Sequence, residues 1–574
     1  MDRKDVATVL EEIGSLLELK GENPFRVRAY RTAARAVAGF PGDLHGALAT
    51  GELAAVKGIG PATLELVSEL LKTGTSKLLD SLRDDMPAAL AEMLKISGLG
   101  VTKIRQIWES LHIDSLEELE EAARDGRLEK LPRFGKKTAE NILKGITFLR
   151  QVSDFKLFYH AWDEAAAIAQ VLGTMPNVTR AAVAGSVRRR REIIRDLDFV
   201  VEVKGTPTAL FDRIGSVAGV TEFVGKTEDS AALRFATGTL ADVYATTTDQ
   251  WGFRLVRSTG SAAHVTGLAQ RAQGKGLEWS DTGLRRDGAL LPLRTEEDVY
   301  QALDLPFIEP ELREGRGEIE AGAAGNLPHL VEAGDIRGFL HCHSDYSDGA
   351  STTHDWAVAA REAGYAYVGI TDHSQAAAYA GGLTVEDIDK QHTEIDAVNR
   401  EFPDVRILKG VEADILESGQ LDYTPEVRGK FDFIIASVHS RFGMDGKQMT
   451  ERILKAMDDP SMAILGHPTG RLLLARDPYP LDVNAVVRKA ADRGVAIEIN
   501  ADPHRLDLDW TLVRQAADAG VTISIGADAH STRAMNYMDL GVGIARKGWL
   551  RKEQVLNTRP IEGFLEHVRS RRKK

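Results

Sequence analysis

The chain has 574 residues, which is too many for one hydrophobic core and predicts several domains. Its hydrophobic fraction of 43% and charged fraction of 27% are those of an ordinary water-soluble protein, and they exclude a chain built from membrane spans. The net charge of −13 excludes a protein coated in basic surface, so any contact with nucleic acid must be local.

The start of the chain and its cysteine content bear on where the protein works. The first residues, MDRKDVATVLEEIG, are polar and acidic, whereas a signal peptide needs a basic start and an apolar core. The single Cys342 excludes an intramolecular disulfide and fits a reducing compartment. We therefore expect a cytoplasmic protein that does not contact membranes, and we expect it to be a monomer.

Residues 4–150 have the pattern of short amphipathic helices separated by Gly and Pro. An apolar turn with glycine precedes a new helix three times, within residues 53–71, 93–111 and 128–146. Such glycines turn the backbone sharply and direct free N–H groups of a helix N-terminus toward an anion such as a phosphate. The glycines concerned are Gly58, Gly60, Gly98, Gly100 and Gly135.

This repeated turn is typical of helix-hairpin-helix elements, which grip nucleic-acid backbones without reading their sequence. Corners between helices in an all-α bundle are the alternative, and the repetition makes that alternative less favourable. Cations beside the second and third turns are available from Lys103, Arg105, Lys136 and Lys137. We expect the five glycines and Lys103 to contact DNA, within an N-terminal helical domain (residues 1–88) and a second hairpin domain (residues 89–153).

From residue 178 the pattern changes to strands, and three aspartates accompany two of them. Asp196 and Asp198 stand two apart at the start of an apolar run, so on a strand their carboxylates face the same side. Two adjacent carboxylates repel each other unless a divalent cation such as Mg²⁺ neutralises them. Asp242 could complete a two-metal phosphoryl-transfer site. Ordinary surface acids are the alternative.

A short turn precedes these aspartates and has the composition of a phosphate-binding loop. Gly185 and Ser186 are followed by the run of arginines from Arg188 to Arg191. Backbone amides, a hydroxyl and guanidinium groups are the donors that hold a triphosphate. Together with the aspartates, this pattern resembles the nucleotidyltransferase palm and specifically the polymerase X family. The resemblance runs from Phe25 to the motif Thr259-Gly260-Ser261 and covers residues 1–318.

The resemblance implies a palm at residues 154–247 and a thumb at residues 248–317. It implies that Asp196, Asp198 and Asp242 bind Mg²⁺ or Mn²⁺ and that Asp242 activates the primer 3′-hydroxyl. It also implies partners, namely deoxynucleoside triphosphates and gapped or nicked DNA. The expected triphosphate contacts are Gly185, Ser186, Arg189 and Gly260.

Several positions depart from the pattern of that family. Arg195 stands where glycine is common, and Val265 stands where some members have an amide. Arg257-Ser258 replace an aromatic pair beside the incoming sugar. Leu66 occupies the position of the Schiff-base lysine of a lyase, so we expect no lyase activity, with Lys72 as a weaker substitute.

After a linker at residues 318–335, seven apolar strands alternate with helical stretches. In alternating β and α units, catalytic residues gather at the C-terminal ends of the strands. Nine side chains of ligand type follow this rule, whereas a lone buried histidine is more often a core residue. They are His341, His343, Asp348, His373, Glu412, His439, His467, Asp528 and His530.

These motifs resemble the polymerase and histidinol phosphatase (PHP) domain, which implies a distorted (β/α)₇ barrel at residues 336–574 with two or three Zn²⁺ or Mn²⁺ ions. By motif, one ion takes His341, His343, Glu412 and Asp528. Glu412 bridges to a second ion held by His439 and His467. The third ion takes Asp348, His373 and His530. The whole chain is then a multidomain α+β and α/β protein.

We therefore hypothesise a DNA repair polymerase that fills short gaps and also processes 3′ ends. The expected processing is 3′–5′ exonuclease action, with 3′-phosphatase activity or abasic-site cleavage as further options. One alternative is a DNA-binding nuclease whose palm is only a scaffold. Another is a phosphatase for small molecules such as histidinol phosphate, against which the hairpin motifs argue.

Overall fold

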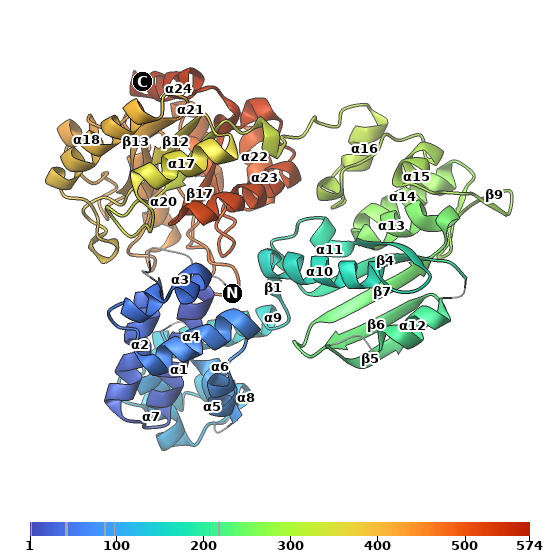
Figure 1. The fold of residues 1–574 in the computed structure, drawn as a ribbon, viewed down its shortest axis with the longest axis horizontal. Helices are drawn as coiled ribbons and strands as arrows, with labels where there is room; N and C mark the ends of the chain where they lie inside the picture. The colour runs from blue at the N-terminus through green and yellow to red at the C-terminus, as the bar shows by residue number, and fades with distance from the viewer. Residues whose placement is uncertain are drawn as a thin grey trace.

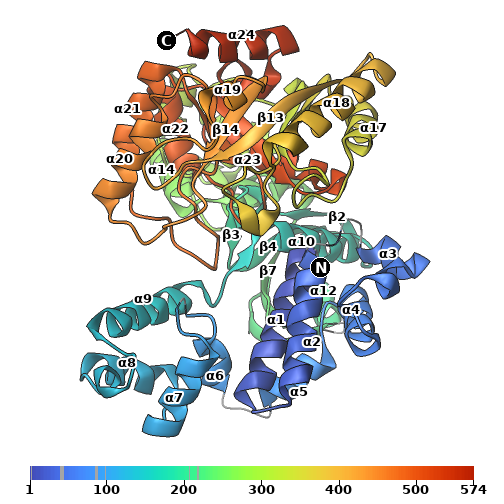
Figure 2. The same cartoon turned by 90° about the vertical axis from the view of Figure 1, so that its left-hand side faces the viewer.

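The computed structural model describes residues 1–574 except residues 2, 39, 41–43, 85–87, 97, 206, 216–218 and 574. Figure 1 shows a helical N-terminal part (blue) beneath a C-terminal barrel (yellow to red), with a palm and thumb (teal to green) beside both. Figure 2 shows α1 (Arg3–Leu19) close to the palm helix α10 (Phe158–Gly173), and His160 of α10 lies 3.5 Å from Asp5 of α1. No helix among the described residues is long and apolar enough to cross a membrane.

The described residues of the N-terminal part form helices joined by turns, with no strand among them. Apolar residues of its first helix recur three or four apart, as Val6, Leu10, Ile13 and Leu17, and all are fully buried. One hydrophobic core runs from Val6 to Ile146 and so joins the two predicted domains. The elements are α1 (Arg3–Leu19), α2 (Pro24–Ala38), α3 (Leu44–Thr50), η1 (Glu52–Ala55), α4 (Pro61–Thr73), α5 (Lys77–Asp84), α6 (Ala88–Met93), α7 (Val101–Leu111), α8 (Leu116–Arg124), η2 (Leu128–Lys130) and α9 (Lys136–Val152).

The palm is a five-stranded sheet in the order β2-β4-β7-β6-β5. Strands β4 and β7 are parallel neighbours, and the register places Asp198 directly opposite Asp242. The elements are β1 (Lys156–Leu157), α10 (Phe158–Gly173), β2 (Val178–Val183), α11 (Gly185–Arg188), β3 (Ile193–Ile194), β4 (Asp196–Val203), α12 (Thr208–Ile214), β5 (Val220–Lys226), β6 (Ser230–Phe235) and β7 (Leu240–Thr246).

The thumb continues into the segment that the sequence predicts as a linker. That segment contains the short helix α16, and the carboxylate of Glu318 is buried 2.7 Å from the His264 ring in the thumb. The elements are η3 (Thr248–Gln250), α13 (Trp251–Thr259), α14 (Ala262–Gly274), β8 (Glu278–Trp279), β9 (Leu284–Arg286), β10 (Ala289–Leu290), α15 (Glu296–Ala302), η4 (Pro310–Leu312), α16 (Glu318–Ala323) and η5 (Ala333–Asp335).

Seven parallel strands close into a barrel in which β17 pairs with β11, which confirms the predicted (β/α)₇ architecture. The strands are β11 (Gly338–Cys342), β12 (Tyr367–Ile370), β13 (Arg406–Asp414), β14 (Phe433–Ser437), β15 (Ile464–Leu465), β16 (Ala496–Asn500) and β17 (Ile523–Ala529). The helices are α17 (Thr353–Ala363), η6 (Ala378–Ala380), α18 (Val385–Glu401), α19 (Pro425–Arg428), α20 (Gly446–Ala456), α21 (Val483–Arg493), α22 (Trp510–Asp518), η7 (Thr532–Tyr537), α23 (Met538–Lys547), η8 (Lys552–Gln554), η9 (Leu556–Thr558) and α24 (Ile561–Arg572).

The palm and the barrel share one hydrophobic core. The same cluster of buried residues contains Phe158 and Phe199 of the palm and Phe339 and Ile525 of the barrel. Because a shared core resists separation of its parts, the palm and the barrel form one packed unit.

Candidate active sites

Three carboxylates gather at one end of the palm sheet. Asp196 and Asp198 lie on β4, and Asp242 lies beside Asp198 on β7. Burial and the negative charges of Asp196 and Asp242 raise the pKa of Asp198 to about 7. Burial and Asp196 also raise the pKa of Asp242. This mutual repulsion is the state that a bound divalent cation would relieve.

The turn before α11 lies directly against these carboxylates. Gly185 has a φ of +58°, and a Cβ atom added there would lie 1.8 Å from Oδ2 of Asp198, so only glycine fits. The hydroxyl of Ser186 is buried and has no hydrogen-bond partner among the described residues. An orphaned buried hydroxyl beside a carboxylate cluster fits a phosphate oxygen as its missing partner.

Arg189 connects this turn to the thumb. Its Nη1 donates to the carbonyl of Thr259, and a Cβ added at Gly260 would lie 2.9 Å from the same nitrogen. Its charge also acts on Asp198, whose pKa it lowers against the stronger effects that raise it. The structure therefore brings together the predicted residues Ser186, Arg189, Gly260 and the carboxylates.

The positions that depart from the family's pattern have identifiable surroundings. Arg195 is exposed, and Arg257 pairs with Asp281 at 2.5 Å. Leu66 is only 4% exposed, within the core of the N-terminal part, and Lys72 is exposed. Because an apolar side chain cannot act as a nucleophile, Leu66 contributes only to packing.

The first two glycine turns adopt the expected conformation, whereas the third has Arg133, with a φ of +70°, where the others have glycine. Gly58 and Gly98 have φ values of +107° and +81°. Gly60, Gly100 and Gly135 are the residues that precede α4, α7 and α9. Lys103 donates to the carbonyl of Gly98 at 2.9 Å and so lies against the second turn. Arg105 does not serve this turn, because it donates to the carbonyl of Glu18 on α1.

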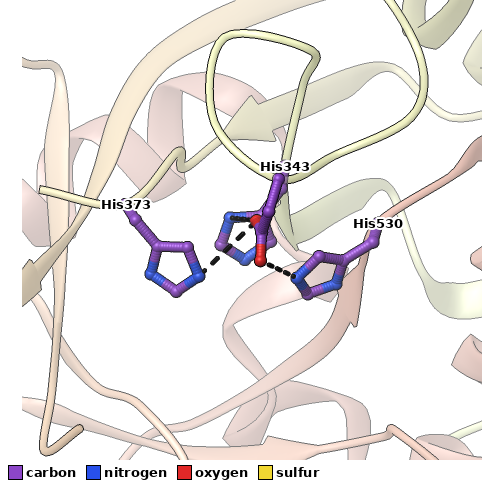
Figure 3. Close-up of side chains that lie close together, drawn as sticks. His343, His373 and His530 are labelled. Carbon is purple, nitrogen blue, oxygen red and sulfur yellow. Dashed lines mark ion pairs between the residues drawn. The ribbon is translucent and has the colours of Figure 1, made fainter. Parts of the chain in front are cut away.

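The ligand-type side chains of the barrel converge at the C-terminal ends of its strands. Figure 3 shows His343, His373 and His530 pointing toward one another. Asp348 lies among them, and its carboxylate oxygens are 3.2 Å from Nε2 of His530 and 3.7 Å from Nε2 of His373. These four side chains offer ligand atoms that lie within 4.8 Å of one another.

Two further groups share members with this one. His341, His343 and Asp528 form the second group, and His373, Glu412 and His439 form the third. His467 joins the third group, because its Nε2 lies 2.9 Å from the Glu412 carboxylate. The structure therefore brings all nine predicted side chains together, with His343 and His373 each near two groups.

The chemistry of this cluster fits metal ions. Burial and the neighbouring rings of His530 and His373 lower the pKa of His343 to about 4, so its ring is neutral at pH 7. Burial opposes protonation of His439 too, but the Glu412 and Asp414 carboxylates outweigh it and raise the pKa to about 10. Seven buried ring or carboxylate atoms lack a hydrogen-bond partner among the described residues, and bound metal would satisfy the carboxylate oxygens and at most one nitrogen of each ring. They are His341 Nε2, both ring nitrogens of His343, Asp348 Oδ1, His373 Nδ1, Glu412 Oε2 and His467 Nδ1.

Two buried carboxylates behind the ligands were missed by the sequence reasoning. Glu498 lies 2.5 Å from Nδ1 of His341, and Asp414 lies 2.6 Å from Nδ1 of His439. A carboxylate in this position fixes the tautomer of a ligand histidine and strengthens it as a ligand. Glu498 comes from β16, the one strand without a predicted ligand, and a lone acid within the apolar run VAIEIN was the available signal.

A cavity of about 420 Å³ opens beside this cluster. Asp528 and His530 form part of its lining, together with Tyr159 of the palm, Tyr537 of η7 and His45 of α3. The rings of Tyr159 and Tyr537 meet edge to face with centroids 5.8 Å apart. Residues of the N-terminal part, the palm and the barrel therefore line one cavity beside the cluster of ligand-type side chains.

Comparison with known families agrees with this architecture. A family model described as a helix-hairpin-helix domain matches residues 1–76, and one described as a SAM-like helix-hairpin-helix tandem matches residues 90–146. The DNA polymerase beta thumb matches residues 254–314, and the PHP domain matches residues 340–502. These matches confirm the expected hairpin regions, thumb and PHP domain.

Comparison with individual proteins extends this agreement to the whole chain. A probable phosphatase of Clostridium acetobutylicum is 42% identical over 109 residues, which are 18% of this chain and 42% of that protein. A probable phosphatase of Syntrophotalea carbinolica is 32% identical over 166 residues, covering 28% of this chain and 64% of that protein. The DNA polymerase/3′-5′ exonuclease PolX of Bacillus subtilis is 36% identical over 574 residues, covering 99% of this chain and all of that protein. The chain therefore belongs to the PolX family, the family X DNA polymerases that carry a C-terminal PHP domain.

Proposed function

We propose that this protein is a DNA-directed DNA polymerase that fills short gaps and that its PHP domain removes or trims the 3′ end of the strand. The observation that carries the proposal is the presence of two separate sites in one chain. One is the carboxylate group of the palm, and the other is the cluster of nine ligand-type side chains in the barrel. Similarity to a DNA polymerase/3′-5′ exonuclease over the whole chain supports the combination.

In the palm, Asp196, Asp198 and Asp242 hold Mg²⁺ or Mn²⁺, which supplies charge neutralisation for phosphoryl transfer. Asp242 accepts the proton of the primer 3′-hydroxyl. The buried hydroxyl of Ser186 and the guanidinium of Arg189 bind the triphosphate of the incoming nucleotide, where they oppose its negative charge. Gly185 and Gly260 allow that close approach.

In the barrel, the nine side chains hold two or three Zn²⁺ or Mn²⁺ ions, which supply Lewis acidity toward a phosphodiester. Glu498 and Asp414 orient the rings of His341 and His439. The preferred reaction is 3′–5′ exonuclease cleavage, and removal of a 3′-phosphate or cleavage at an abasic site uses the same chemistry.

In the N-terminal part, the glycine turns hold the backbone of gapped or nicked DNA. The three helix N-termini at Gly60, Gly100 and Gly135 support this role, because they have no side-chain cap and a helix N-terminus attracts phosphate. Lys103 adds a positive charge at the second turn. We place the protein in the cytoplasm as a monomer, and its single cysteine supports a reducing compartment.

A gapped duplex with a one-nucleotide gap tests both halves. Single-nucleotide insertion should occur with Mg²⁺ or Mn²⁺, should be lost in Asp198→Ala and should persist in His341→Ala. Release of 3′ nucleotides should show the opposite pattern. Absence of insertion by the wild-type protein with either metal would refute the polymerase half, and equal hydrolysis by His341→Ala and wild type would refute the hydrolase half.

A second candidate function is a DNA nuclease whose palm is only a scaffold. Arg195 and Arg257-Ser258 favour it, because they change the surroundings of the incoming nucleotide. It predicts no insertion by the wild-type protein but hydrolysis in Asp198→Ala. A third candidate, a small-molecule phosphatase, rests on similarity of the barrel to probable phosphatases. Comparing turnover of histidinol phosphate with that of a DNA 3′ end separates it from the others.

A further inference from the structure

The arginine-rich turn of the palm is contacted from outside by the barrel. Nη1 of Arg190 lies 2.9 Å from the carboxylate of Asp539 on α23. The carboxylate of Glu192 lies 3.3 Å from Nη2 of Arg471. Between these two ion pairs, Nζ of Lys547 donates to the backbone carbonyl of Arg189 at 3.0 Å. The barrel therefore touches the turn that carries the expected triphosphate contact.

Lys547 is the most buried of these barrel residues. Its side chain is 0% exposed, although it ends in an ammonium group. The ammonium group has three donors, and it contacts three acceptors: the carbonyls of Arg189 and Glu311 and the carboxylate of Glu314. All three acceptors belong to the palm or the thumb. Burial lowers the pKa of Lys547 to about 8 against the effect of Glu314, so the paired ammonium group is still mainly charged at pH 7.

Glu314 is shared between the barrel and the palm. Besides its ion pair with Lys547, its carboxylate lies 3.2 Å from Nε of Arg189 and 3.9 Å from Arg191. Its side chain is only 10% exposed. A buried carboxylate attracts every cation within reach, so Lys547 and Arg189 compete for the same charge.

The opposite edge of the Arg189 guanidinium faces the nucleotidyl-transfer site. Nη1 donates to the carbonyl of Thr259 beside Gly260, and the guanidinium acts electrostatically on Asp198. The Arg189 side chain is therefore attracted by Glu314 on one side and by the palm carboxylates on the other. The positive charge of Lys547 beside Glu314 weakens the attraction between Glu314 and the Arg189 guanidinium.

We propose that Lys547 of the PHP barrel is a positioning residue for nucleotide binding in the palm. It neutralises Glu314 and anchors the Arg189 backbone, which leaves the Arg189 guanidinium available to a triphosphate. This inference rests on the proposed polymerase function and assigns to the barrel a part in it that is separate from hydrolysis. The barrel side chain itself touches neither the nucleotide nor the metal ligands.

The test compares Lys547→Met with Asp539→Asn as a matched control. Both changes remove a contact between α23 and the same palm turn, but only the first touches Glu314 and Arg189. Insertion kinetics on one-nucleotide-gapped DNA with Mn²⁺ should give a KM for the nucleotide that is raised roughly tenfold or more in Lys547→Met. In Asp539→Asn it should stay within about twofold of wild type, as for other surface ion pairs.

Three further measurements separate positioning from general damage. Binding of a deoxynucleoside triphosphate to the enzyme on a dideoxy-terminated primer should weaken by the same factor as KM rises. The double variant Lys547→Met/Glu314→Gln should recover most of the loss, because the competing charge on Glu314 is gone. Hydrolysis of a DNA 3′ end should remain at the wild-type rate in all of these variants.

Each outcome has one meaning. If the wild-type protein inserts no nucleotide, the proposed polymerase function is refuted, and this inference falls with it. Wild-type insertion with equal nucleotide KM in Lys547→Met and Asp539→Asn overturns the inference, as does a double variant no better than Lys547→Met. If Lys547→Met does not fold, Lys547→Gln carries the same test, because its amide keeps a donor for the Arg189 carbonyl and removes the charge.

Discussion

At the scale of single residues, buried charge governs both sites. Asp198 lies between two other carboxylates, and its pKa is raised to about 7 in the absence of metal. His343 lies between two other imidazoles, and its pKa is lowered to about 4. In each case the surroundings disfavour the charged form of the side chain. A divalent cation would stabilise the charged carboxylate of Asp198 and would bind the neutral ring of His343.

The first prediction concerns Asp198→Asn in metal-free protein. The folded-state pKa of Asp198 is raised above its unfolded value near 3.8, so stability falls as pH rises from about 4 through 7. Asparagine removes this penalty, and the variant should be more stable than wild type by roughly 2 kcal/mol at pH 8. Urea unfolding in EDTA at pH 5 and pH 8 measures it. The gain should shrink at pH 5, and an equal gain at both pH values would contradict the prediction.

The second prediction concerns Glu498→Gln behind the metal ligands. Loss of the charge paired with His341 should weaken Mn²⁺ binding, or the rate of 3′-end hydrolysis, by roughly 10- to 100-fold. Glu318→Gln is the matched control, because Glu318 is equally buried and also pairs with a histidine, His264, in the thumb. Isothermal titration with Mn²⁺ compares the two. Similar affinity in both variants would rule out the assigned role of Glu498.

The sequence predicts ligand-type residues better than the residues that support them. The nine side chains of the barrel were found because polar residues at strand ends break an apolar pattern. Glu498 and Asp414 were missed, because their role depends on which strands become neighbours in the closed barrel. The orphaned hydroxyl of Ser186 likewise follows from packing and not from local sequence.

At the scale of elements, the glycine turns combine two demands, a positive φ and an exposed helix N-terminus. Gly98 has a φ of +81°, and nothing lies within 4 Å of the position of an added Cβ. Substitution there therefore tests backbone conformation without a steric clash. Gly126 has the same φ and the same free space, but it lies outside the three turns.

The third prediction uses this pair. Gly98→Ala and Gly126→Ala should each destabilise the protein by about 1 kcal/mol, because alanine resists positive φ. Only Gly98→Ala should also weaken binding to gapped DNA, by several-fold. Fluorescence anisotropy at two salt concentrations measures the affinity. Equal affinities for the two variants would count against a DNA contact at the second turn.

The kind of element followed from the sequence where the hydrophobic pattern was strong. The strand that carries Asp196 and Asp198 was predicted and is found as β4, and all seven barrel strands were anticipated. Residues 318–335 have the composition of a linker, yet α16 forms there because Glu318 pairs with His264, 54 residues earlier. A partner so distant in sequence leaves no local signal.

At the scale of the whole molecule, the cores are distributed differently from the predicted domains. The palm and barrel share one hydrophobic core, and the N-terminal part has a core of its own. Residues that share a core unfold together, whether or not they are adjacent in sequence. The thumb has a third core, from Phe253 to Leu312, and it meets the barrel where Lys547 pairs with Glu314.

The fourth prediction follows from the shared core. Mn²⁺ bound in the barrel at 100 times its dissociation constant should add about 2.7 kcal/mol to the stability of the unit that binds it. Because palm and barrel unfold together, calorimetry should show one transition for both, and Mn²⁺ should move it as a whole. His373→Ala should reduce the shift. A palm transition that stays in place while a barrel transition moves would contradict the prediction.

The cavity beside the barrel cluster has walls from three parts of the chain, and those walls set what can enter. Because the cavity is only about 420 Å³, we expect a 3′ end to approach His530 past Tyr159 and Tyr537 as a separated single strand, so a paired duplex end must first melt. Melting costs a few kcal/mol and costs least at a mismatched end. The hydrolase would therefore discriminate against errors without reading any base. Its rate on a 3′ end would depend on how often that end opens, so mismatched ends would be removed faster than paired ends.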